Sequence, residues 1–446
     1  MDRTGIYSRQ VRGPGGTFIG RDVVPLWIAD MEFSAPRPVV DAVVERARHG
    51  VYGYTDCPPE LTKATIERLS SVYGSAIAPD ATWFRWLPGL VPGLNHAVRA
   101  WCAHGSGYAV AVVTPIYPPF LAAASNNGAR LLRVPLAEVR GASSSLRYEI
   151  DWAAMEAALA APETKLLLWC NPHNPTGRCW SRTEMSRLAA LCVANDVALC
   201  SDEVWGEVPL EAETAPFTSA LALLDPSEAD GATAGTGGGE SPAKRARKED
   251  GSASSGAATG DGDGVGAVPG LLERLVVLTS PSKCFNVASL DVALAVVPHA
   301  LHFQRFRGAG RDAAEVTPMG YAACLAAYTE PEAEAWRQRL LVYLRANRDL
   351  AAAVLSTIPG VRATSPEASY LMWIDATEAV ARRATSGGVE PVPASEHLLA
   401  HGVGLSAGQD FGTTAGFTRL NLACTRATLE RGLERICEAL GEPASE

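Results

Sequence analysis

The sequence predicts an α/β fold with a mostly parallel central sheet flanked by helices, together with a smaller α+β domain. Four short apolar runs, at residues 108–113, 165–170, 197–201 and 275–279, have the length and composition of buried strands. Amphipathic stretches such as residues 183–194 lie between them, and turn-forming residues lie close to each run. Continuous apolar strands separated by helices are typical of a parallel sheet that is covered on both faces.

The order of these patterns along the 446 residues indicates three parts, since a chain of this length exceeds one ordinary domain core. Residues 1–49 are expected to form an N-terminal arm and part of a small domain, and residues 50–310 the large domain. Residues 311–446, with longer helical patterns at 340–355 and 426–440, are expected to complete the small domain.

One segment within the large domain has a different composition. Residues 225–270 consist mainly of Gly, Ala, Ser, Asp and Glu with almost no large apolar side chain. Such a segment cannot bury enough surface to offset the entropy of ordering, so we interpret it as a disordered insert in a surface loop. It contains the basic run KRARK at 244–248, which is interpreted first as a solvated charge run and alternatively as a nuclear localisation signal.

The composition argues against several classes of protein. Hydrophobic residues make up 47% and charged residues 20%, and the net charge of −10 disfavours nucleic-acid binding. Ten cysteines without a CxxC pair are typical of reduced thiols, and eight scattered histidines suggest no metal site. We find no signal peptide and no apolar run of about 18 residues that would span a membrane. The sequence therefore predicts a cytoplasmic protein with a small-molecule substrate.

Chemically suggestive side chains follow three of the predicted strands. Residues 171–177 (NPHNPTG) follow the second strand, Asp202 follows the third, and Lys283 follows the fourth. A parallel sheet brings the carboxyl ends of its strands to one edge, so we expect these groups to meet. A lysine with a lowered pKa can form an imine with an aldehyde, and a carboxylate can keep a pyridine nitrogen protonated. Hydroxyls and N–H groups at a helix start can hold a phosphate.

These motifs resemble those of a known family. NPHNPTG (171–177), SDE (201–203) and SPSKCFN (280–286) are similar to motifs of fold-type I pyridoxal 5′-phosphate (PLP) enzymes of the class I/II aminotransferase family. Within it they resemble most the MalY/PatB group of cystathionine β-lyase-like carbon–sulfur (C–S) lyases. Further blocks occur in the same order, namely PLWIADMEF (25–33), GVYGYT (50–55), LPGLVP (87–92), TPIYPP (114–119) and FTRLNLA (417–423). The resemblance implies the aspartate aminotransferase-like fold of PLP-dependent transferases, PLP as cofactor, and a homodimer.

The resemblance also implies roles for single residues. Lys283 is expected to be the Schiff-base lysine and the base that moves the α-proton. Asp202 is expected to pair with the pyridine nitrogen, and Asn174 to bind the ring hydroxyl. Tyr117 would stack on the cofactor ring, and Arg419 would bind the α-carboxylate of the substrate through its two-pronged guanidinium group.

For the cofactor phosphate, the resemblance implies binding by backbone N–H groups of Gly89, Leu90 and Val91, helped by Ser280 and Ser282. Two further positions complete the expected site. The backbone of Ala29 is expected to lie beside the substrate carboxylate, and Tyr54 to reach the phosphate of the neighbouring subunit.

Three positions depart from the family pattern, and one of them, Ser289, stands where the closer group usually has glycine. Many aminotransferases have a tyrosine three residues after the aspartate, and the MalY-like group often has histidine, but this chain has Trp205. Many aminotransferases also place an arginine eight residues after the lysine, where this chain has Asp291. A carboxylate at that point would repel a phosphate.

The family shares its first steps, in which the substrate amine displaces the lysine and the Cα proton is removed. A thiolate then leaves in β-elimination, giving pyruvate and ammonia, or a keto acid leaves in transamination. We expect a C–S β-lyase acting on L-cystathionine, cysteine or cysteine S-conjugates. A class I/II aminotransferase is the alternative, and a regulatory or binding protein on the same fold is a second alternative.

Overall fold

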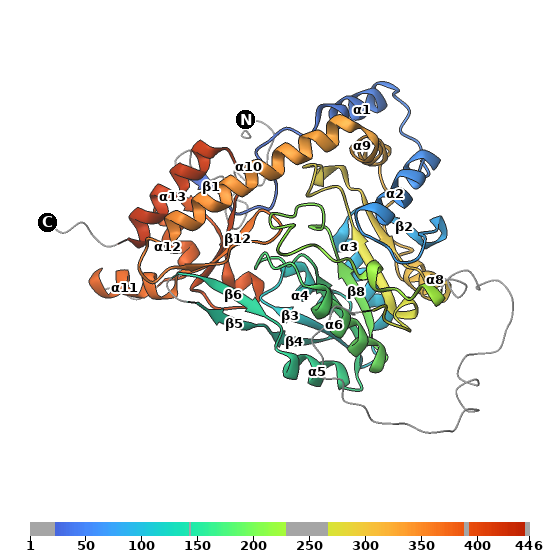
Figure 1. The fold of residues 1–446 in the computed structure, drawn as a ribbon, viewed down its shortest axis with the longest axis horizontal. Coiled ribbons are helices and arrows are strands. Elements are labelled where there is room, and N and C mark those ends of the chain that lie inside the picture. Colours follow the sequence, from blue (N-terminus) through green and yellow to red (C-terminus); the bar gives the residue numbers. More distant parts are fainter. Residues whose placement is uncertain (1–22, 142–143, 229–265, 388–391, 442–446) are drawn as a thin grey trace.

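The computed structural model describes residues 23–141, 144–228, 266–387 and 392–441. Its centre is a seven-stranded sheet with the strand order β2-β10-β9-β8-β7-β3-β4 (Figure 1). The strands are β2 (Phe84–Leu87), β3 (Ala109–Thr114), β4 (Arg130–Pro135), β7 (Thr164–Cys170), β8 (Ala198–Asp202), β9 (Leu275–Thr279) and β10 (Ala293–Val296). The strand β10 is antiparallel to β2 and β9, whereas β4, β3, β7, β8 and β9 are parallel to one another. The predicted fold class is confirmed.

The sequence forms this sheet because its strands are apolar on both sides. Every residue of β3, β8, β9 and β10 is buried, as the continuous apolar runs indicated. The four predicted strands differ from β3, β7, β8 and β9 by at most one residue at either end.

Helices cover the sheet. The helix α3 (Leu90–Trp101) packs against β7 to β10, and it also contacts α4 (Pro118–Asn126) and α8 (Ala300–Ala309). A second group consists of α5 (Trp152–Ala160) and α6 (Arg182–Ala194), which contact each other and the strands β7 and β8. The helix α6 begins at a capping box formed by Ser181 and Glu184, which satisfies two N–H groups at its start.

A second, smaller sheet lies in the C-terminal part. It is antiparallel, with the order β11-β12-β15-β14, and its strands are β11 (Arg362–Ala363), β12 (Leu371–Asp375), β14 (Ser406–Ala407) and β15 (Phe417–Asn421). The helices of this part are α11 (Thr377–Gly387), α12 (Ala394–Ala400) and α13 (Arg426–Leu440). The N-terminal strand β1 (Val24–Pro25) pairs in parallel with β13 (Val403–Gly404), so the N-terminal arm joins the C-terminal part. The domain boundaries drawn from the sequence stay a prediction.

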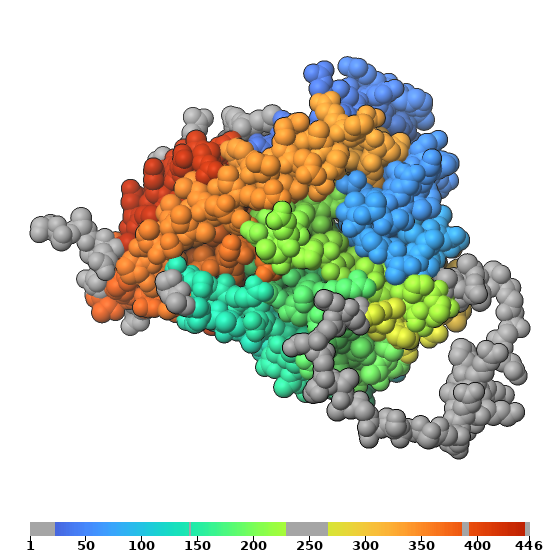
Figure 2. All heavy atoms as spheres, in the orientation of Figure 1, coloured from blue at the N-terminus to red at the C-terminus, as the bar shows by residue number. Residues whose placement is uncertain are grey.

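The long helix α10 (Pro331–Leu355) lies along one face, from the C-terminal part towards the N-terminal helices (Figure 2). There it meets α1 (Arg37–Arg48) and α9 (Pro318–Thr329), and α9 contacts α2 (Pro59–Ser71). The helix α10 starts nine residues before the predicted residue 340, because Pro331 stands in its first turn with Glu332 and Glu334. A hairpin of β5 (Ala137–Arg140) and β6 (Leu146–Glu149) completes the fold.

The prediction of a disordered insert at residues 225–270 was wrong at both ends of that range. Residues 226–228 form a short 3₁₀ helix, and Val268 is buried with its N–H donating to the Leu223 carbonyl at 2.8 Å. Burial of the apolar Val268 side chain in the core stabilises this end of the segment. The rest of the insert, with KRARK at 244–248, lies outside the described residues. In the described parts of the chain, no helix has the length and apolarity needed to cross a membrane.

Candidate active site

A pocket of about 200 Å³ lies at the carboxyl ends of β7, β8 and β9. It is lined by Ala29, Gly89, Leu90, Val91, Leu94, Tyr117, Cys170, Asn174, Asp202, Val204, Trp205, Ser280, Ser282, Lys283, Ala288, Asp291 and Val292. Ten of the twelve residues predicted for the site are in this set. The other two, Arg419 and Tyr54, are not.

Lys283 lines the pocket with a buried amine. Its Nζ donates a hydrogen bond to the Ala29 carbonyl at 2.8 Å. Burial lowers the pKa of Lys283 to about 8, with a further contribution from the charge of Arg419, while Asp30 and Asp202 oppose the shift. An amine with this pKa is neutral in part near pH 7, so it can act as a nucleophile and as a base.

Asp202 ends β8 with only 4% of its surface exposed. In the described structure its carboxylate accepts one hydrogen bond, from the Val204 N–H at 3.1 Å. Burial raises its pKa to about 7, although that hydrogen bond and the charge of Lys283 lower it in part. A buried carboxylate with so few donors suits a cationic partner placed in the pocket, such as a protonated ring nitrogen.

Asn174 links the pocket to Arg419. The Asn174 Oδ1 accepts from the Arg419 Nη1 at 3.0 Å, which orients the amide, and the Asn174 carbonyl accepts from the Tyr117 N–H at 3.1 Å. Because its oxygen is engaged, the Asn174 amide has its two N–H donors left for an acceptor. Asn174 and Tyr117 are therefore held together at one side of the pocket.

Arg419 lies on β15, behind Asn174, and is 4% exposed. Its Nη2 donates to the Trp27 carbonyl at 2.8 Å, but its buried Nε has no partner in the described part of the chain. Burial lowers the pKa of Arg419 to about 10, so the group is still charged at neutral pH. A buried guanidinium with an unused donor is suited to a carboxylate ligand.

The start of α3 lines another part of the pocket and can bind an anion. The helix α3 starts there after Gly89, whose φ of 151° favours glycine, and no side chain caps its first N–H groups. The Ser280 hydroxyl donates to the Val292 carbonyl at 2.7 Å and accepts from the Ser282 N–H at 3.0 Å. No partner is described for the Ser282 hydroxyl, which is therefore the better placed of the two serines to bind a ligand.

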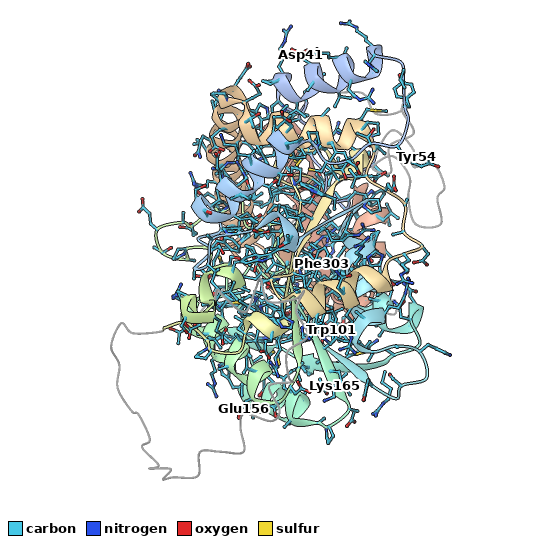
Figure 3. The ribbon with its side chains drawn as sticks, turned by 90° about the vertical axis from the view of Figure 1, so that its right-hand side faces the viewer. Asp41, Tyr54, Trp101, Glu156, Lys165 and Phe303 are labelled. Carbon is cyan, nitrogen blue, oxygen red and sulfur yellow. The ribbon has the colours of Figure 1, made fainter. Side chains whose placement is uncertain are left out.

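Tyr54 lies away from this pocket. It is fully exposed at 100%, and it points outward from the segment between α1 and α2 (Figure 3). Within one chain it makes no contribution to the site.

Three residues that hold the N-terminal arm at the site were not expected from the sequence to do so. The Tyr370 hydroxyl donates to the Ala29 carbonyl at 3.3 Å, and Asn421 donates to the Ile28 and Asp30 carbonyls at 2.6 and 2.7 Å. Asn286 bonds to the backbone of Met31 and Phe33. Asn286 and Asn421 lie inside the family motifs at 280–286 and 417–423, so their place in these motifs could have indicated a role at the site. Tyr370 lies in no such motif.

Known proteins are similar to this chain in sequence and in fold. The chain matches the family described as aminotransferase class I and II over residues 21–240 and 249–436. It is 31% identical over 450 residues to the cystathionine β-lyase PatB of Bacillus subtilis, covering 98% of each chain. The crystal structure of OvoB is similar with a TM-score of 0.75 and 32% identity, covering 95% of this chain and 94% of the other. The PLP-bound C–S lyase of Staphylococcus hominis is similar with a TM-score of 0.78 and 25% identity, covering 99% and 97%.

Proposed function

Because this chain belongs to the class I and II aminotransferase family, we propose that it is a PLP-dependent C–S β-lyase. Its substrates would be L-cystathionine, cysteine or cysteine S-conjugates, and its products pyruvate, ammonia and a thiol. The observation that carries the proposal is the meeting of Lys283, Asp202 and Asn174 in one pocket of a chain that is similar to a cystathionine β-lyase along nearly its whole length.

The pocket fits PLP from end to end. Asp202 would face the ring nitrogen, the Asn174 amide would donate to the ring oxygen, and Tyr117 would cover the ring. The N-terminus of α3 and the Ser282 hydroxyl would hold the phosphate. Bound there, PLP supplies an aldehyde carbon that captures amines and a ring that accepts electrons from the substrate Cα.

The residues of the chain then do the proton chemistry. Arg419 would bind the substrate carboxylate through its unpartnered Nε, while Nη2 stays bonded to the Trp27 carbonyl and holds the guanidinium in place, and this contact would fix the direction of the Cα–H bond. Lys283 Nζ takes the Cα proton and delivers it to the sulfur that leaves from Cβ. Asp202 would hold the protonated ring nitrogen, because a cation beside its buried carboxylate is favoured.

We propose further that the protein is a cytoplasmic homodimer. All ten cysteines lie in the described residues and are free thiols, as expected in a reducing compartment. The exposed Tyr54 would reach the phosphate site of the second subunit. Analytical ultracentrifugation should give twice the chain mass of 47.0 kDa, and a monomer that is active at the same concentration would contradict the proposal.

The test of the reaction is pyruvate release from L-cystathionine by the purified protein with added PLP. A Lys283→Ala variant is the negative control, and a Lys63→Ala variant, changed at an exposed surface lysine, is the matched control that should stay active. Absence of pyruvate from a protein that shows cofactor absorbance would favour an aminotransferase. Absence of any cofactor band would favour a regulatory or binding protein.

A further inference from the structure

Trp205 presents its ring to the lysine of the pocket. It lines the pocket three residues after Asp202, and only 2% of its surface is exposed. The Lys283 Nζ lies 5.8 Å from the centre of the ring, within the reach of about 6 Å of a cation–π contact. Tryptophan gives the strongest such attraction of the aromatic side chains, so this ring favours the ammonium form of Lys283 over the neutral amine.

The ring is fixed by Tyr370. The two rings pack edge to face with centroids 4.7 Å apart at 84°. The Tyr370 hydroxyl donates to the Ala29 carbonyl, which is also the acceptor for Lys283. Ser369, with a φ of 73°, holds the backbone before Tyr370 in a conformation that a non-glycine residue rarely adopts. Trp205, Tyr370 and the Ala29 carbonyl thus define one position for the ammonium group.

The burial of Lys283 and the charges around it together place its pKa near neutral pH, at about 8. Asp30 in the N-terminal arm and Asp202 on β8 favour the ammonium form, whereas burial and Arg419 on β15 favour the amine. A contribution of the size of one cation–π contact therefore changes the protonation of this lysine measurably near neutral pH.

We propose that Trp205 is a positioning residue that holds Lys283 in its protonated form at the Ala29 carbonyl. The inference rests on the proposed function, in which Lys283 must keep the proton taken from Cα until the leaving sulfur receives it. A tyrosine or a histidine at this position would offer a smaller or a more polar surface to the ammonium group.

The protonation of Lys283 can be measured in the cofactor-free protein without any turnover. The chain has only five lysines, Lys63, Lys165, Lys244, Lys248 and Lys283, so trace acetylation with acetic anhydride can be assigned to each by peptide mass spectrometry. The rate of labelling from about pH 6 to about pH 10 gives the pKa of each amine. Lys63, whose side chain is 80% exposed, is the internal reference.

Trp205→Leu should lower the pKa of Lys283 by roughly 0.5 to 1, which makes acetylation near pH 7 about 2.5- to 5-fold faster. Trp205→Phe, which keeps a weaker ring, should give an intermediate value, and Lys63 should not change. An unchanged or higher pKa of Lys283 in both variants would overturn the proposal. If Trp205→Leu does not fold, as judged by circular dichroism, Trp205→Phe alone decides by the same criterion.

The pyruvate assay on the wild-type protein separates the two proposals. A lowered pKa in the variants, with no pyruvate from the wild type, would remove the lyase function and leave the effect of Trp205 on Lys283 standing. Pyruvate release without any change of the pKa in the variants would refute the role of Trp205 and leave the lyase function standing.

Discussion

Replacing Asp202 with asparagine should make the cofactor-free protein more stable above neutral pH. The buried carboxyl of Asp202 has its pKa raised to about 7, whereas an unfolded aspartate titrates near 3.9. The folded protein therefore binds this proton more tightly than the unfolded chain does. The resulting stability is fully present below about pH 4 and is lost as the pH rises through about 7.

The size of the effect follows from the two pKa values. A difference of about three pH units corresponds to roughly 4 kcal/mol, which is an upper limit for the loss between acid and alkaline pH. Glu203 adds a loss of the same sign, because burial raises its pKa to about 7 as well. Asparagine does not ionise, so the variant lacks the loss due to Asp202 and keeps the contributions of Glu203 and of the other ionisable groups. We expect Asp202→Asn to exceed the wild type by about 2 kcal/mol at pH 8, since a buried amide also needs hydrogen-bond partners.

The assay is urea denaturation of the cofactor-free proteins from about pH 5.5 to about pH 8.5. The free energy of unfolding of Asp202→Asn relative to that of the wild type should rise by about 2 kcal/mol across this range, because the other ionisable groups, including the buried histidines, contribute alike to both proteins. Asp41→Asn, changed at an exposed carboxylate on α1, is the matched control and should follow the wild type. A pH profile of Asp202→Asn as steep as that of the wild type would refute the reasoning. The same variant should lose lyase activity, because asparagine cannot hold a cationic ring nitrogen.

Four further substitutions test other parts of the site. Arg419→Lys should raise the KM for L-cystathionine by about 30-fold or more, because lysine lacks the two-pronged geometry; a KM within threefold of the wild type would contradict the carboxylate role. Asp291→Asn should tighten cofactor binding by about 2- to 5-fold in a fluorescence titration by removing a repulsion that solvent partly screens, and weaker binding would argue that Asp291 helps to hold the phosphate. Ser282→Ala should weaken cofactor binding by about 5- to 10-fold, whereas Ser280→Ala should mainly lower the free energy of unfolding, since the Val292 carbonyl loses its donor; equal losses of affinity would count against this division.

The central sheet and the meeting of Lys283, Asp202 and Asn174 could be predicted from the sequence for one physical reason. Buried parallel strands are continuous apolar runs, and the residue after each run must lie at the same edge of the sheet. The edges of the predicted insert were misplaced because composition averages over a window and does not detect a single buried valine such as Val268. The roles given to the single residues stay predictions.

Contacts between the two sheets could not be predicted from the sequence pattern. The hydrogen bond from Arg419 to Asn174 joins residues that are 245 positions apart, and it depends on how the small sheet docks on the large one. Tyr370 reaches Ala29 because Ser369 takes a left-handed backbone conformation that its residue type does not announce. Tyr54 stays outside the pocket of its own chain, so its part in the site depends on an assembly that one chain cannot display.

The pairing of β1 with β13 has a consequence for the order in which the protein folds. Val24 pairs with Val403, and Trp27 supplies a carbonyl to Arg419, 392 positions later in the chain. The arm that carries the acceptor for Lys283 is therefore synthesised before the central sheet, but its partners are synthesised after that sheet. A ribosome-bound chain whose residues 403–421 are still inside the ribosome can form the central sheet. The N-terminal arm is not yet docked at that stage, so Lys283 has no acceptor from it. Contacts of such long sequence separation form slowly, so catalytic competence should arrive late, after most of the secondary structure has formed.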